Sequence, residues 1–345
     1  MEMNVFVTGG YFDDSGECVV WSLDFDRGTH EVVLRWTPPD FLRVPGKGFA
    51  GGCIGDDGFL YVAAHAAVVK IDPNRWKVLG VLHQPCMNDV HHVACIQDRI
   101  YIANTGLESV DVFSKRGDFM GSHALLPSWV NARRMMGQEP SNWDECLHVG
   151  WNPHERGFWN TADETDDYHT KNRTVGSFHQ HKVRDCFHIN HVAIHNGSVL
   201  ATCFRTGSLR DLTNHKTVFQ REEAYLHDGL IVDESIWLSA IDGRLFEIDQ
   251  QTYRAKKTLE VFDTGHVGWC RGLALHKKGM LVGLTQVRRE RMPRHRWSDV
   301  SPDNSETSVL LISPQNGALK RRIDITDQQR HSKIYSILIQ DGRTS

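Results

Sequence analysis

The sequence predicts an all-β fold, a seven-bladed β-propeller that forms a single domain over residues 1–345. Three observations predict it. A unit of one apolar strand, a tight polar turn and a second apolar strand recurs along the chain, and the two ends of the sequence are half-units that complete each other. No stretch of useful length has the 3.6-residue period of a helix. The 40% hydrophobic residues allow a sizeable core.

The first strand of the repeat is recognisable seven times. Its copies are residues 49–54, 90–95, 146–151, 189–194, 226–231, 269–274 and 334–339. Turns rich in Asp, Asn and Gly follow most copies, and these residues tolerate the positive φ angles of tight hairpins. A four-stranded blade needs about 40–45 residues, so longer spacings between copies indicate insertions. If the segment after Cys146 is an excursion rather than a blade, six blades remain.

The two ends of the chain predict how the ring closes. Residues 334–339 have no second strand after them, and residues 4–9 have no first strand before them. We therefore expect the C-terminal strand to pair with the N-terminal strands in one blade. Such closure removes the open sheet edges that otherwise favour aggregation.

Histidines coincide with one position of the repeat. The third residues of the seven first strands are Gly51, His92, His148, His191, Asp228, Arg271 and Ser336. Equivalent positions on inner strands form a ring around the axis of a propeller, so His92, His148 and His191 predict a site for a divalent transition metal, zinc, iron or manganese. Asp228 is expected to be a fourth ligand, an acceptor for an imidazole N–H or a general base. Arg271 is expected to orient an anionic substrate.

A shift of one residue changes this ring, because side chains alternate along a strand. The second residues of the same strands are Ala50, His91, Leu147, Asn190, His227, Cys270 and Tyr335. In that register, His91 and His227 are the alternative metal ligands.

Three long insertions, residues 127–145, 162–182 and 286–306, are expected on the face where the first strands begin. Long loops in compact domains are commonly lids or binding loops. The segment 287–297 is strongly basic, and Arg288 and Arg289 are expected to bind an anionic substrate together with Arg271. The acidic segment 162–169 either pairs with the basic one or is an ordinary surface turn.

Composition limits the partners. The net charge is −4 without a basic bias, so nucleic acid is not an expected partner. No run of about 18 apolar residues predicts a membrane span, and the first residues do not form a secretory signal. The eight cysteines are scattered and form no Cys-x-x-Cys pair, which favours reduced thiols and a cytoplasmic protein.

The blade layout and the axial histidines resemble propeller enzymes that hold a metal on the channel axis. These are the seven-bladed carotenoid oxygenases and the six-bladed lactonases related to strictosidine synthase. The resemblance implies His92, His148 and His191 as axial ligands. A fourth histidine, present in the oxygenases, is missing here unless Asp228 replaces it. The lactonases use mainly carboxylate and amide ligands, which differ from this set.

The leading hypothesis is a metal-dependent enzyme for a small polar, anionic molecule. The metal would polarise the substrate or lower the pKa of a bound water, which favours a hydrolase or lyase first and an iron-dependent oxygenase second. The alternative is a non-catalytic scaffold that binds a peptide or protein on the top face of the propeller.

Overall fold

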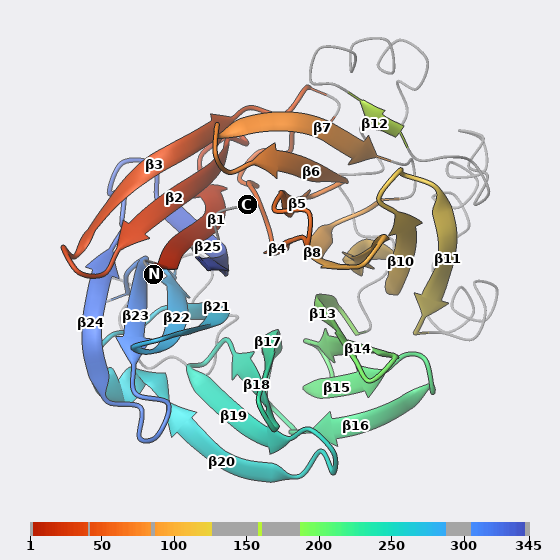
Figure 1. Ribbon diagram of the computed structural model, residues 1–345. Helices are drawn as coiled ribbons and strands as arrows, with labels where there is room; N and C mark the ends of the chain where they lie inside the picture. The colour runs from red at the N-terminus through yellow and green to blue at the C-terminus, as the bar shows by residue number, and fades with distance from the viewer. Residues whose placement is uncertain are drawn as a thin grey trace.

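The computed structural model describes residues 3–40, 42–83, 87–125, 158–160, 187–287 and 305–341. These residues form sheets arranged as a ring around a central axis (Figure 1). Helical structure within them is limited to two 3-10 turns, Thr105–Leu107 and Val261–Thr264. The predicted all-β propeller is therefore confirmed.

Six sheets make up the ring, and their strands are ordered from the axis outward. Blade 1 contains β25 (Ser332–Asp341), β1 (Met3–Tyr11), β2 (Cys18–Asp24) and β3 (Thr29–Trp36), and blade 2 contains β4 (Gly52–Ile54), β5 (Leu60–Ala64), β6 (Ala67–Asp72) and β7 (Lys77–His83). Blade 3 contains β8 (Val90–Ile96), β9 (Arg99–Asn104), β10 (Ser109–Ser114) and β11 (Phe119–Ala124), and blade 4 contains β13 (Ile189–His195), β14 (Ser198–Cys203), β15 (Ser208–Asp211) and β16 (Lys216–Gln220). Blade 5 contains β17 (Leu226–Val232), β18 (Ser235–Ala240), β19 (Arg244–Asp249) and β20 (Ala255–Glu260), and blade 6 contains β21 (Trp269–His276), β22 (Gly279–Thr285), β23 (Ser308–Ile312) and β24 (Leu319–Asp324).

The ring has six blades rather than seven. The inner strands contact one another in the closed order β25, β4, β8, β13, β17, β21 and back to β25, so β8 lies directly beside β13 with no blade between them. The predicted strand 146–151 lies outside the described residues. Strand β12 (Phe158–Asn160), which follows it, pairs with β7 at the outer edge of blade 2. The count of seven is corrected to the alternative of six.

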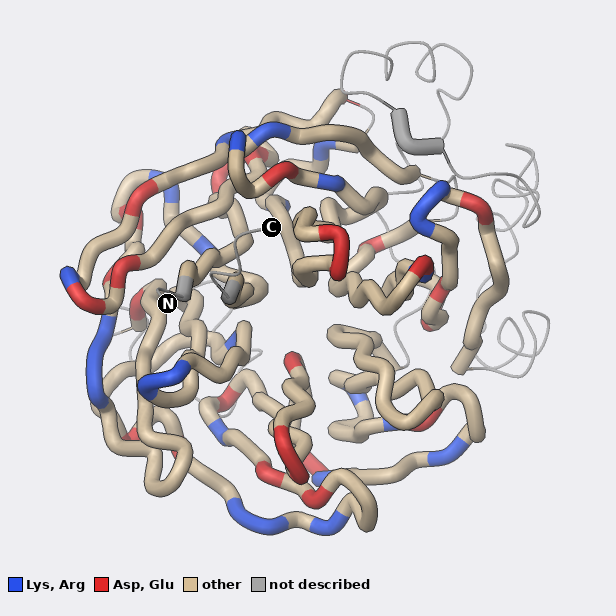
Figure 2. Tube along the Cα trace, in the orientation of Figure 1, with Lys and Arg blue, Asp and Glu red and all other residues tan. Residues whose placement is uncertain are grey.

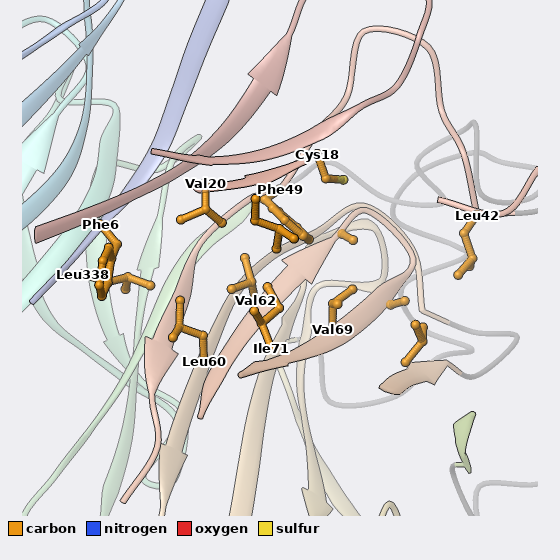
Figure 3. Packing of buried hydrophobic residues seen from close by; sticks show 14 of the residues in the cluster. Phe6, Cys18, Val20, Leu42, Phe49, Leu60, Val62, Val69, Ile71 and Leu338 are labelled. Carbon is orange, nitrogen blue, oxygen red and sulfur yellow. The ribbon is translucent and has the colours of Figure 1, made fainter. Parts of the chain in front are cut away.

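The hydrophobic core lies between neighbouring blades. Figure 3 shows one such contact, where Phe6 and Leu338 of blade 1 face Leu60 and Val62 of blade 2. The middle strands of the blades, such as β5, β18 and β22, are completely buried because both of their faces pack against other blades. The outer strands are partly exposed. Acidic and basic residues are interspersed along those outer strands (Figure 2).

The two ends of the chain share one sheet. β25 pairs antiparallel with β1 over its whole length, with Val5 opposite Ile339 and Tyr11 opposite Ser332. β25 is thus the inner strand of blade 1 and also contacts β21 and β4 of the neighbouring blades. The first residues of β25 are therefore positioned near the axis by strands from both ends of the sequence.

Two further findings concern the surroundings of the protein. No helix within the described ranges is long and apolar enough to cross a membrane. The cysteines in these ranges, Cys18, Cys53, Cys95, Cys203 and Cys270, are free thiols.

The closure of the ring predicts the effect of truncating Ile334. This β25 side chain is completely buried in the core cluster of blades 1 and 6. We expect Ile334→Ala to lower the free energy of unfolding by about 2–5 kcal/mol, because it leaves a cavity. Leu319→Ala, on the exposed side of β24, is the control and should cost about 0.5 kcal/mol or less. Urea unfolding measures both, and equal effects would contradict the prediction.

Candidate functional site

Five of the six inner strands contain a β-bulge near their first residues. The residues at these irregularities are Tyr335 in β25, His91 in β8, Asn190 in β13, His227 with Asp228 in β17, and Gly272 in β21. A bulge inserts an extra residue into one strand and turns the neighbouring side chains to a new direction. Strict alternation therefore fails at this end of the ring, and residues from both predicted registers contribute to one site.

A cavity of about 580 Å³ lies at this end of the axis. Its lining includes His91, Asn190, His227, Arg271 and Tyr335 from five inner strands, and blade 2 contributes through Lys47 in the segment before β4. The size suits a small organic ligand. Three predicted residues, Arg271 and the alternative pair His91 and His227, are thus brought together around one pocket.

Arg271 is a cation of the cavity wall that contacts aromatic rings. Its Cζ lies 4.8 Å from the centroid of the Trp269 ring and 4.5 Å from that of Tyr335. Within the described part of the chain its guanidinium forms no ion pair, and its Nε is buried without a hydrogen-bond partner. Contacts with aromatic rings do not satisfy all of the five N–H donors of arginine. The side chain is therefore ready to accept a bidentate anion.

Two lysines face the same space. Lys333 is 1% exposed, and its Nζ donates to the carbonyl of Gly46. Its Nζ also lies 5.5 Å from the centroid of the Tyr335 ring. Lys47 Nζ is 3.3 Å from Oδ1 of the buried Asp89, and this carboxylate raises the pKa of Lys47 despite burial. The cavity thus contains more positive than negative charge among the described residues.

This charge acts on Tyr335. Burial raises the pKa of the phenol, but Lys333, Lys47 and Arg271 outweigh that effect and lower the pKa of Tyr335 to about 7. Burial lowers the pKa of Lys333 to about 8, with Tyr335 opposing this and the other two cations adding to it. Both groups therefore change charge near neutral pH.

His227 and Asp228 form a hydrogen-bonded pair in β17. Nδ1 of His227 donates to Oδ2 of Asp228 at 2.9 Å, and the same oxygen accepts the N–H of Gly272 at 2.5 Å. Gly272 has a φ of +74°, which suits glycine at the β21 bulge. Burial raises the pKa of Asp228, but His227, His191 and these hydrogen bonds lower it below its usual range. Because Nδ1 carries the proton, Nε2 is the basic nitrogen of His227.

Two of the three predicted metal ligands meet. The rings of His92 and His191 have centroids 4.0 Å apart and are tilted by 42°. Burial lowers the pKa of both, that of His191 to about 4, so both are neutral at pH 7. Two imidazoles that bind one zinc ion with Zn–N distances of about 2 Å have ring centroids about 5 Å apart. The centroids of His92 and His191 are closer than that, so the two rings are in direct contact with each other. Nδ1 of His92 is also within 3.5 Å of the Val192 N–H.

His92 and His191 alone do not form the predicted metal site. Within the ranges that the structure describes, no group of three His, Cys, Asp or Glu side chains is placed to hold a metal ion. His148 lies outside these ranges, so the set of His92, His148, His191 and Asp228 stays a prediction. Arg288 and Arg289 also lie outside them, although Val287, the preceding residue, lines the cavity.

Sequence reasoning missed Lys47 and Lys333 as site residues. Lys333 directly precedes the predicted strand 334–339 and is two residues before Tyr335, and residues two apart in an extended segment face the same side. That spacing was a usable signal for Lys333. Lys47 lies in an irregular segment before β4, and nothing in its sequence context distinguishes it from a surface lysine. Accepting an imidazole N–H was one of the roles expected for Asp228, and the structure identifies His227 as that imidazole, a pairing that depends on the bulge in β17.

The hydrogen bond between His227 and Asp228 predicts how Asp228→Asn changes the free energy of unfolding. Because folding lowers the pKa of Asp228, its carboxylate contributes stability that is present above the usual value of 3.8 and is lost as the pH falls below it. We expect the variant to be less stable by about 1.5–3 kcal/mol at pH 7, with a smaller difference at pH 3.5. Urea unfolding at both pH values tests this, with Asp233→Asn in an exposed turn as the control. A difference that does not change with pH would contradict it.

Comparison with known proteins supports the fold alone. No family model matches the sequence, and no curated protein matches it. A chain in the crystal structure of a nidogen/laminin complex is similar over 99% of this chain and 100% of its own length, with a TM-score of 0.57 and 9% identity. A streptogramin B lyase structure is similar over 86% of this chain and 74% of its own, with 11% identity and a TM-score of 0.48, too low to support an argument. The likeness to the nidogen/laminin chain agrees with a β-propeller and does not identify a family.

Proposed function

We propose that this protein is an enzyme that binds a small organic anion in the axial cavity and moves a proton with His227 as the general base. The observation that carries the proposal is a pair of cations, Arg271 and Lys333, on the wall of one cavity, neither of which pairs with a carboxylate of the described residues. A reducing, cytoplasmic setting and a small-molecule partner belong to the same proposal.

The two cations favour an anion for an energetic reason. Burying an ammonium or guanidinium without a counter-ion is costly, and a charge-assisted hydrogen bond to a carboxylate or phosphate offsets that cost. Lys333 is almost completely buried and has unused donors, and Arg271 has an unsatisfied Nε. Asn190, 2% exposed, adds a buried Oδ1 without a partner among the described residues, which can accept a hydrogen bond from the ligand.

The pair of His227 and Asp228 supplies the chemistry. Asp228 fixes the tautomer of His227 and stabilises the imidazolium that forms when Nε2 takes a proton, as the carboxylate does in other His–Asp pairs. The proton comes from a carbon beside the bound anionic group or from a water molecule. The first case begins an elimination and the second a hydrolysis, so lyase and hydrolase chemistry share this step. Oxygenase chemistry needs the predicted metal and depends on His148.

A binding scaffold without catalysis is the competing function. Such a scaffold would bind its partner in the cavity or on the top face of the propeller, and it would not transfer a proton. The hydrogen bond between His227 and Asp228, on the cavity wall, favours the enzyme. A protein that binds anions and exchanges no proton would fit the scaffold instead.

The binding step predicts the effect of Arg271→Lys. We expect the affinity for sulfate, measured by calorimetry, to fall by about tenfold or more, because lysine cannot form the bidentate contact. Arg210→Lys is the matched control, since Arg210 packs on the Phe187 ring at 5.0 Å outside the cavity. Equal sulfate affinity in the wild type and Arg271→Lys would contradict the anion site.

The catalytic step predicts proton exchange. Pyruvate is a small anion with weakly acidic methyl protons, and a general base beside it accelerates their exchange with D₂O. We expect wild-type protein to catalyse this exchange, followed by NMR, and His227→Gln to lose about 100-fold or more of the rate. His276→Gln, at a buried histidine outside the cavity, is the control. Binding of pyruvate without exchange would contradict the enzyme and favour the scaffold.

A further inference from the structure

Aromatic rings line one side of the cavity. Phe204 follows β14, Tyr225 precedes β17 and Trp269 begins β21, so the rings come from three neighbouring blades. Phe204 is 5.0 Å from Tyr225 between ring centroids, and it lies parallel to Trp269 within 6°, at 6.3 Å. His188 adds a fourth ring, 5.2 Å from Phe204. We call Phe204, Tyr225, Trp269 and His188 the aromatic wall.

The aromatic wall is not simply part of the core between blades. Tyr225 is 37% exposed, and none of the four residues is fully buried. The wall is also held in place: the carboxylate of Glu108 in blade 3 accepts the N–H of His188 at 3.2 Å and that of Phe187 at 2.9 Å. A fixed apolar surface that faces a cavity is a recognition surface, because its burial by a ligand stabilises the complex.

Two lysines line the cavity from the blades on the other side of the ring. Lys333 and Tyr335 come from blade 1 and Lys47 from the segment before blade 2. Arg271 joins the two sides, because its Cζ is 4.8 Å from the Trp269 ring and 4.5 Å from the Tyr335 ring. A ligand whose anionic group reaches Arg271 therefore has the aromatic wall immediately beside it.

We propose that the ligand of this cavity is an aromatic anion, a carboxylate or phosphate attached to a planar ring that packs on the aromatic wall. This inference rests on the proposed anion site and names its substrate class. Inorganic anions would leave most of the 580 Å³ cavity unused. An aliphatic anion would cover the aromatic wall but would not form the favourable stacked or edge-to-face contacts that two aromatic rings form with each other.

A cationic ligand is the other occupant that aromatic walls commonly bind. Here two of the rings already have a guanidinium over them: Arg205 Cζ lies 5.8 Å from the Phe204 ring, and Arg271 lies over Trp269. A further cation would be repelled by both arginines and by Lys333. The charges therefore select an anion.

Calorimetry with three carboxylates tests the substrate class on the full-length protein. We expect benzoate to bind about tenfold or more tighter than acetate, and about three- to tenfold tighter than cyclohexanecarboxylate, which has a similar size without aromaticity. Tyr225→Leu should reduce the preference for benzoate and leave acetate binding within about twofold of the wild type. Tyr225 is exposed, so its variant tests the wall without risk to folding, and Trp36→Leu, outside the cavity, is the control.

The outcomes separate this inference from the proposed function. Equal affinities for the three carboxylates, all weakened by Arg271→Lys, would leave the anion site in place and overturn the aromatic class. Benzoate and cyclohexanecarboxylate bound equally would also overturn it, because only apolar volume would then count. If none of the three binds, the anion site itself is wrong and the inference falls with it.

Discussion

The pairing of β25 with β1 is the constraint on which both the ring and the site depend. It makes the C-terminal strand the innermost strand of the blade that the N-terminus completes. Lys333 and Tyr335 are thereby placed beside Lys47, which lies near the other end of the sequence, and beside Arg271, which belongs to blade 6. A positively charged cavity results from closing the ring, and its charges are held by strands that cannot separate without opening the propeller.

The bulges at the start of the inner strands explain how this cavity is lined. In β8 and β17 the extra residue directs His91 and His227 to the cavity, whereas His92 and His191 meet each other elsewhere near the axis. In β21 the bulge falls at Gly272, which is later in the repeat than the bulges of β8 and β13. Arg271 rather than the buried Cys270 therefore lines the cavity. The same glycine anchors Asp228 through its N–H. One type of irregularity thus sets the positions of His227, Asp228 and Arg271.

The sequence predicted much of the fold and part of the site. Recurrent apolar strands with polar turns were enough to predict the propeller, because few other folds repeat strands and turns at this spacing. The blade count was one too high, because residues 146–151 look like the other first strands although no blade lies between β8 and β13. Arg271, His91 and His227 were found as candidates, but their common cavity was not, because a single register cannot describe strands with bulges. Lys47 was invisible, because its position depends only on tertiary structure.

The proposed function requires Arg271 and Lys333 to bind an anion at the axis of the propeller. Diffraction from a crystal grown with selenate measures this most directly, because selenium scatters anomalously and marks the anion. We expect an anomalous peak within hydrogen-bonding distance of the Arg271 guanidinium and the Lys333 ammonium. A crystal that shows no peak there, with Arg271 paired to a carboxylate of the protein itself, would contradict it.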